Sequence, residues 1–124
     1  MEVKFKVWNK KDKQMIDWFT LTQNAWNTFR GETPLSLIYD VLVARKDDFD
    51  KLLFTGYLYK NNKEIYEGDI FISKRNILYT VKFIDGGFIG AGINSHFEIR
   101  IYKLIEEGKY LGNIYENPEL LGVS

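Results

Sequence analysis

Apolar and polar residues alternate along much of this chain, and short clusters of turn-forming residues separate the alternating stretches. At the N-terminal end, Val3, Phe5 and Val7 fall on one side, and charged residues lie between them. An interval of two residues between apolar positions is typical of a half-buried β-strand. Residues 9–13 are polar and predict a turn, after which residues 15–21 can return as a second arm. The pattern therefore predicts an N-terminal β-hairpin.

Residues 19–53 have a less regular pattern, and we interpret them as an insertion. Thr33 offers a helix N-cap and Pro34 the first helical position, which predicts a helix at about residues 34–44. A strand is the alternative for this segment, because apolar residues also occur in it at every second position. The alternating positions are Leu37, Tyr39, Val41 and Val43. Residues 46–50 fit a turn or a new helix start, and an arm exchanged between subunits also stays open.

From residue 55 onward the pattern predicts short strands joined by tight turns. The expected turns lie at residues 61–62, 67–68, 74–76 and 85–87. Asn62 can adopt the left-handed backbone conformation that the first of these turns needs, because asparagine tolerates it better than most residues. The turn at residues 85–87 follows an alternating strand, and together they give a strong hairpin signal.

Two further strands are predicted towards the C-terminal end. Residues 97–101 alternate as a half-buried strand, and residues 110–114 are short enough to close a sheet. Five or more short strands at this spacing favour a small barrel, with a core at about residues 55–116. Asn117 and Pro118 then repeat the pattern of a cap and a first helical residue, which predicts a short C-terminal helical turn.

Composition limits the classes of function. The 124 residues (14.6 kDa) fit a single domain, 1–124, and the 16% aromatic content can fill a large core for this size. The formal net charge is zero, whereas dedicated nucleic-acid binders are usually basic. There are no cysteines, so thiolate chemistry and disulfides are absent, and we expect a cytoplasmic protein without a cofactor. No signal peptide is apparent, and no segment approaches the ~20 apolar residues of a membrane span.

Residues 61–70 and 112–121, taken with Lys4–Trp8 and Met15, resemble the YopX family of small phage and prophage proteins. The resemblance implies an SH3-like barrel with additional elements in a phage or prophage accessory protein of the bacterial cytoplasm. The resemblance does not assign a catalytic residue to this chain. The residues that we expect to carry the structural motif are Gly56, Asn62, Glu67, Gly68, Asp69, Gly112, Asn113, Asn117 and Pro118.

At two places the sequence departs from the family pattern, and this limits which residue roles the resemblance assigns to this chain. Asn9 follows Trp8 where the family usually has aspartate. Residues 59–62 replace a turn that usually holds an acid and a glycine. A family role that depends on those acids is therefore not assigned to this chain. The turn keeps Asn62, which suits its geometry, but lacks the acid, and this indicates that the loop has a backbone role.

The acids and the single histidine are weak candidates for chemistry. Glu64, Glu67 and Asp69 are close in sequence and could form an acid/base pair or a metal site, but acids beside a glycine turn more often accept backbone hydrogen bonds. The acids at positions 47, 48 and 50 lack the glycine of a calcium loop. His96 follows Ser95 without a nucleophile-elbow motif, and the glycines at 86, 87, 90 and 92 do not form a phosphate loop. We therefore expect no catalytic or metal site.

Two kinds of binding surface are more plausible than catalysis. Lysines near the N-terminus can form a basic edge with Trp8 as a stacking platform for nucleic acid, although lysines also protect exposed strand edges from aggregation. These lysines are Lys4, Lys6, Lys10, Lys11 and Lys13. The aromatic excess predicts instead a protein interface or a homo-oligomer contact. Its candidates are Trp18, Trp26, Tyr57, Tyr59 and Tyr66.

The sequence thus predicts a mainly β, non-enzymatic binding protein. A protein partner or self-association is the first hypothesis and nucleic-acid binding the second. A carboxylate-dependent hydrolase is a remote third.

Overall fold

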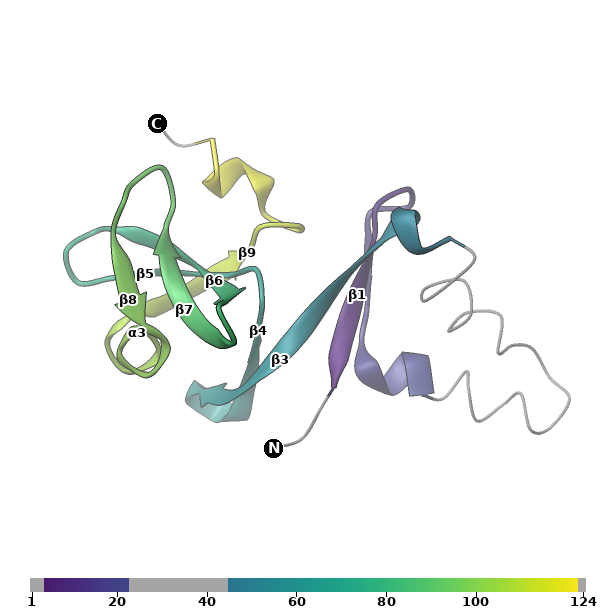
Figure 1. Ribbon diagram of the computed structural model, residues 1–124, viewed down its shortest axis with the longest axis horizontal. Coiled ribbons are helices and arrows are strands. Elements are labelled where there is room, and N and C mark those ends of the chain that lie inside the picture. Colours follow the sequence, from purple (N-terminus) through teal and green to yellow (C-terminus); the bar gives the residue numbers. More distant parts are fainter. Residues whose placement is uncertain (1–3, 23–44, 123–124) are drawn as a thin grey trace, which may run out of the picture. The chain divides into compact units, whose positions relative to one another are not determined.

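A computed structural model describes residues 4–22 and 45–122 of the chain (Figure 1). The chain divides into two compact units, one from Val3 to Leu53 and the other from Phe54 onward. Residues 55–116, over which the barrel core is predicted, belong to the second unit. The helix predicted at residues 34–44 lies outside the described residues.

The predicted N-terminal hairpin is confirmed in the first unit. Strand β1 (Phe5–Asn9) pairs antiparallel with β2 (Gln14–Ile16), and Val7 faces Ile16 in the register. The side-chain Oδ1 of Asn9 accepts hydrogen bonds of 3.1 Å from the backbone N–H groups of Lys11 and Asp12. Such an Asx turn reverses the chain without glycine.

The second arm of this hairpin is shorter than predicted. The prediction of a strand over residues 15–21 is wrong beyond Ile16, because residues 18–22 are helical. Asp17 begins this helical segment, since its Oδ1 accepts a 2.7 Å hydrogen bond from the Thr20 N–H. That hydrogen bond is the main cause of a lowered pKa at Asp17. The helical turn brings Leu21 into a small core with Val7 and Phe49.

Strand β3 (Phe49–Tyr59) follows a single 3-10 turn, η2 (Lys46–Asp48), which is the turn expected near residues 46–50. The first half of β3 pairs with β1, with Leu53 opposite Phe5. Its second half pairs with β4 (Lys63–Tyr66), with Phe54 opposite Tyr66. The β3–β4 register shifts between Phe54 and Leu58, around Gly56, whose φ is +88°.

The turn between β3 and β4 confirms the role predicted for its asparagines. It is the short segment η3 (Lys60–Asn62), in which φ is +60° at Asn61 and +61° at Asn62. Both residues are in the left-handed region, which asparagine occupies more readily than other residues with a Cβ. The turn therefore forms without a glycine.

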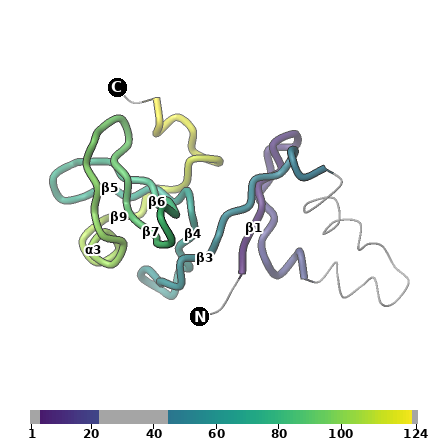
Figure 2. The backbone as a smooth tube through the Cα atoms, in the orientation of Figure 1, coloured from purple at the N-terminus to yellow at the C-terminus, as the bar shows by residue number. Residues whose placement is uncertain are grey.

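The second unit contains a five-stranded antiparallel sheet in the order β8-β7-β6-β5-β9. Its strands are β5 (Asp69–Ile72), β6 (Leu78–Ile84), β7 (Gly87–Gly92), β8 (Glu98–Arg100) and β9 (Lys109–Asn113). The backbone trace in Figure 2 shows how β9 returns beside β5 after the chain has passed through β6, β7 and β8. The curled sheet confirms the prediction of a small, mainly β, SH3-like barrel fold.

The strand predicted over residues 97–101 ends early. It stops at Arg100, and α3 (Ile101–Glu107) follows directly. Ile101 and Leu104 point into the core because they are three residues apart on one face of the helix. A Cβ atom at Gly90 would come within 2.8 Å of the Leu104 side chain, so glycine at this position allows the helix to approach β7 closely.

The main core lies between the five-stranded sheet, β4 and α3. Its buried members come from all three elements: Ile65, Phe71, Tyr79, Val81, Ile101 and Leu104. The predicted C-terminal helical turn is also present, as η4 (Pro118–Leu120). Among the helices of residues 4–22 and 45–122, none is long and apolar enough to cross a membrane.

Candidate functional site

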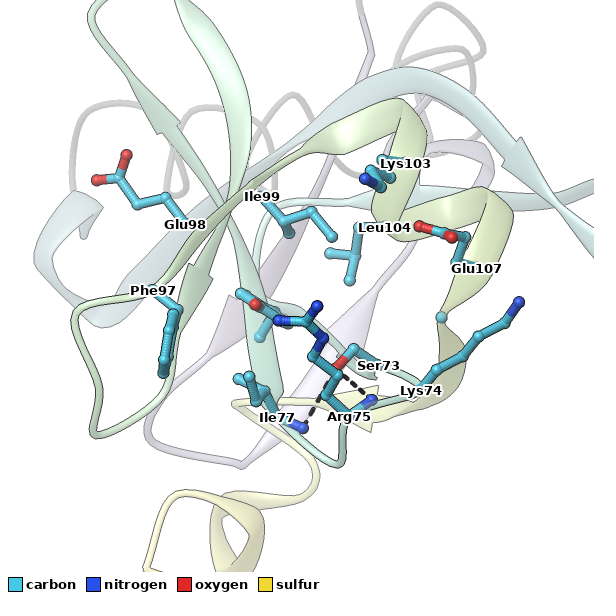
Figure 3. A pocket seen from close by; sticks show the side chains of 12 residues that line it. Ser73, Lys74, Arg75, Ile77, Phe97, Glu98, Ile99, Lys103, Leu104 and Glu107 are labelled. Carbon is cyan, nitrogen blue, oxygen red and sulfur yellow. Dashed lines mark hydrogen bonds between the residues drawn. The ribbon is translucent and has the colours of Figure 1, made fainter.

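A cleft of about 660 Å³ lies between the β5–β6 turn, the start of β8 and helix α3 (Figure 3). This volume is within the ~300–1,000 Å³ range of typical ligand sites. The lining residues come from three segments that are far apart in sequence: Ser73, Lys74, Arg75, Ile77, Tyr79, Phe97, Glu98, Ile99, Lys103, Leu104, Glu107 and Gly108. All of them belong to the second unit.

The β5–β6 turn has a fixed conformation. Ser73 Oγ accepts hydrogen bonds from the backbone N–H groups of Arg75 (3.3 Å) and Ile77 (3.2 Å). The Ser73 N–H also donates to the Ile77 carbonyl at 2.9 Å, and Asn76 has a φ of +64°. The backbone that carries Lys74 and Arg75 is therefore held in place before any ligand binds.

The floor of the cleft is apolar. Leu104 has no exposed surface, Tyr79 is buried, and Ile77 and Ile99 are half-buried. Phe97 stands beside them with 57% of its surface exposed. A large exposed aromatic residue next to an apolar floor can contact a ligand without any rearrangement of the core.

Charged side chains surround this floor. Three are cations (Lys74, Arg75 and Lys103) and two are carboxylates (Glu98 and Glu107). In Figure 3 the guanidinium of Arg75 lies over the middle of the cleft, whereas the ends of Lys74 and Glu98 point away from it. Within the described parts of the chain, Arg75 forms no ion pair. Arg75 is therefore the charge best placed to meet a bound group.

The two sequence segments that carry the family resemblance lie next to each other. Asp69 is opposite Asn113 and Ile70 is opposite Gly112 in the β5–β9 register. Asp69 is only 1% exposed, and its Oδ2 accepts a 2.8 Å hydrogen bond from the Tyr66 N–H. This geometry is the backbone-acceptor role expected of an acid beside a glycine turn.

The asparagines of the C-terminal segment also bind backbone. Asn113 Oδ1 accepts hydrogen bonds from the N–H groups of Tyr115 (3.0 Å) and Glu116 (2.8 Å), and its Nδ2 donates to Glu116 Oε1 at 2.7 Å. Asn117 was expected to cap η4, but it makes no side-chain cap there. Its Oδ1 instead accepts a hydrogen bond from the Asn113 N–H. The cap prediction is wrong because this carbonyl oxygen stabilises the preceding bend.

The aromatic candidates occupy different environments. Tyr66 is buried, and its hydroxyl contacts Glu64 at 3.1 Å. Tyr59 is half-buried against Phe71, with ring centroids 5.4 Å apart. Tyr57 is 41% exposed. In the first unit, Trp18 packs edge-on against Phe5, and Trp8 is half-buried. Trp26 lies outside the described residues.

The N-terminal lysines do not all contribute to one free basic edge. Alternation along β1 places Lys6 and Trp8 on the same side of the strand, and Lys4 precedes its first residue; all three are half-buried. Lys10 forms an ion pair with Asp50 (3.4 Å) and donates to the Asp47 carbonyl (3.0 Å). Lys11 and Lys13 are exposed in the turn.

The remaining chemical candidates do not converge. Ser95 and His96 are both exposed in the β7–β8 turn. No group of three or more histidine and acidic side chains that could hold a metal occurs in residues 4–22 and 45–122. The cleft itself was missed by sequence reasoning, because it is assembled from three separate segments. The cluster Lys74-Arg75 at a tight turn was its one local signal.

Comparison with known proteins identifies the family and the fold. A crystal structure of protein EF1440 from Enterococcus faecalis is similar, with 22% sequence identity, a TM-score of 0.59, and coverage of 98% of this chain and 99% of that chain. No curated protein matches the sequence significantly. The profile of the YopX protein family matches residues 4–122. Because this match spans nearly the whole sequence, the chain belongs to the YopX protein family.

Proposed function

We propose that this chain is a non-catalytic protein-binding module, and that the cleft beside α3 is where it contacts its partner. The observation that carries the proposal is the combination of an apolar floor, an exposed Phe97, and an Arg75 that forms no ion pair within residues 4–22 and 45–122. Aromatic residues and arginine are the residue types that dominate binding energy at protein interfaces. As part of the same proposal, the family resemblance supports a phage or prophage protein acting in the cytoplasm of a bacterial host.

Several features favour binding over catalysis. The carboxylates of the cleft, Glu98 and Glu107, come from different elements, and Glu98 points away from the floor (Figure 3). A carboxylate-dependent hydrolase needs a carboxylate that can reach the reacting atoms. Asp69, the most deeply buried acid of the family motif, is already hydrogen-bonded to backbone.

The charge distribution favours a protein over nucleic acid. Phosphate backbones bind to surfaces where cations are not accompanied by acids. The cleft mixes three cations with two carboxylates. A mixed charge pattern around an apolar centre is instead typical of protein interfaces, which have a polar rim around a more apolar core.

Selection from a displayed library of random peptides tests this proposal. We expect the wild-type chain to enrich peptides that the Phe97→Ala variant no longer retains. Phe83→Ala is the matched control, because Phe83 is also exposed but does not line the cleft. Enrichment that is equal for wild type and Phe97→Ala would contradict a role for the cleft.

Light scattering on the same proteins separates a foreign partner from self-association. A dimer that dissociates in Phe97→Ala but not in Phe83→Ala would make a second copy of the chain the partner. A salt-sensitive mass increase with a pool of oligonucleotides, lost in Phe97→Ala, would replace the proposal with nucleic-acid binding.

A further inference from the structure

We infer that the cleft selects a peptide segment in which a carboxylate side chain lies next to a large apolar side chain. This inference rests on the proposed function, since it names the class of partner that the same cleft would take. It follows from three properties of the cleft: its apolar floor, the position of Arg75, and the balance of charges around it.

The apolar floor provides the position for the large side chain. The half-buried Ile77 and Ile99 present apolar surface beside the buried Leu104 and Tyr79, and the exposed Phe97 adds to it. Burying a leucine or phenylalanine side chain on such a surface contributes roughly 1.5–3 kcal/mol. The cleft of about 660 Å³ has room for such a side chain and its neighbours in the peptide.

Arg75 provides the position for the carboxylate. Its guanidinium lies over the middle of the cleft, and its backbone N–H is held by Ser73. Arginine and carboxylate groups can form two parallel hydrogen bonds, which fixes the orientation of the ligand as well as adding affinity. Because Arg75 has no ion-pair partner in the described residues, a ligand carboxylate need not displace an internal one.

The charge balance favours one carboxylate over a phosphate group. With three cations and two carboxylates, the cleft has a surplus of one positive charge. A single carboxylate neutralises that surplus. A phosphate carries about −1.5 to −2 charges at neutral pH and would be repelled more strongly by Glu107.

Peptide titration of the isotope-labelled full chain, followed by NMR, tests the inference. The parent peptide has eight residues and pairs one glutamate with one phenylalanine, with glycine and serine elsewhere. Three relatives replace the glutamate by glutamine, lysine or phosphoserine, and a fourth replaces the phenylalanine by serine. We expect the parent to shift amide signals of residues 73–77 and of α3, and the glutamine peptide to bind about tenfold more weakly.

Matched variants connect the effect to Arg75. Arg75→Ala should reduce affinity for the parent peptide about tenfold and bring it close to that of the glutamine peptide. Arg100→Ala is the control, because Arg100 is also exposed but does not line the cleft. Arg75→Glu should reverse the preference and favour the lysine peptide. Arg75 is exposed on a turn, so these substitutions leave the core intact.

The outcomes separate this inference from the proposed function. Equal binding of the glutamate and glutamine peptides, tighter binding of the phosphoserine peptide, or an unchanged affinity in Arg75→Ala would each overturn the inference. If display selection nevertheless gives peptides that depend on Phe97, the proposed function stands. If no peptide of any composition shifts the signals of the cleft, both fail.

Discussion

The backbone N–H of Ile114 donates a 2.9 Å hydrogen bond to the carbonyl oxygen of Gly68. This bond joins the two sequence segments that most clearly mark the family, one at the start of β5 and the other just after β9. Gly68 itself donates to the Val81 carbonyl at 2.8 Å, so its peptide groups connect three separate parts of the second unit. The family motif is thus a structural junction, and the cleft that we propose for binding is formed by other residues.

Asp69 is expected to be essential for stability. Asp69→Asn removes the charge of a buried carboxylate that accepts the Tyr66 N–H, and it should lower the free energy of unfolding by about 1–3 kcal/mol. Urea denaturation measures this. Asp85→Asn, at an exposed turn position with a φ of +52°, should change stability by less than about 0.5 kcal/mol. Normal stability of Asp69→Asn together with lost binding would assign this residue to function instead.

Gly112 should not tolerate a side chain. Its φ is +145°, and a Cβ atom there would collide with the side chain of Asn117. Gly112→Ala should therefore cost about 2–4 kcal/mol of unfolding free energy. Gly87→Ala is the control, since its Cβ would meet no atom within 4 Å, and it should cost at most about 1 kcal/mol. Similar thermal midpoints for the two variants would contradict the close packing at Gly112.

Tyr110 should make stability depend on pH in the alkaline range. Burial, followed by the negative charges of Asp69 and Glu116, raises the pKa of Tyr110 from 10.0 to about 12. The folded state thus favours the neutral phenol, and this contribution is intact below pH 10 and is lost as the pH rises towards 12. Tyr110→Phe should lose less stability than wild type over that interval. Parallel pH dependence of the two proteins would show that Tyr110 ionises as readily in the folded as in the unfolded state.

The β3–β4 turn should accept glycine but not a β-branched residue. Asn62 has a φ of +61°, a conformation that valine adopts only with strain. Asn62→Val should lower the free energy of unfolding by about 1–3 kcal/mol, whereas Asn62→Gly should leave it nearly unchanged. Chemical denaturation of both variants distinguishes this backbone role from one that needs the asparagine side chain, in which case the two would be equally destabilised.

Much of the fold is predictable because local signals and tertiary contacts agree. The turn at residues 61–62 and the hairpin at 85–87 depend on residues that tolerate positive φ, and both form as expected. Helix α3 was missed because Ile99 and Ile101 continue the alternation of a strand, and no capping residue precedes the helix. Its signals were the helical spacing of Ile101, Leu104 and Ile105 and the terminating Gly108.

The candidate site could not be predicted from local sequence patterns, for a different reason. Arg75, Phe97 and Leu104 come together only when the β5–β6 turn, β8 and α3 take their places around one core. Each of these residues alone fits an ordinary surface turn, strand end or core helix. Among the aromatic candidates that the structure describes, Tyr57 is exposed and Tyr66 is buried, whereas the exposed Phe97 was not a candidate because it was assigned to a half-buried strand.

The pairing of β9 with β5 has a consequence for synthesis on the ribosome. A nascent chain that ends before Lys109 already contains β5 to β8 but has no partner for the free edge of β5. Exposed strand edges favour pairing with other chains, so incomplete products are expected to aggregate or to be degraded. Completion of this sheet therefore requires that β9 has emerged.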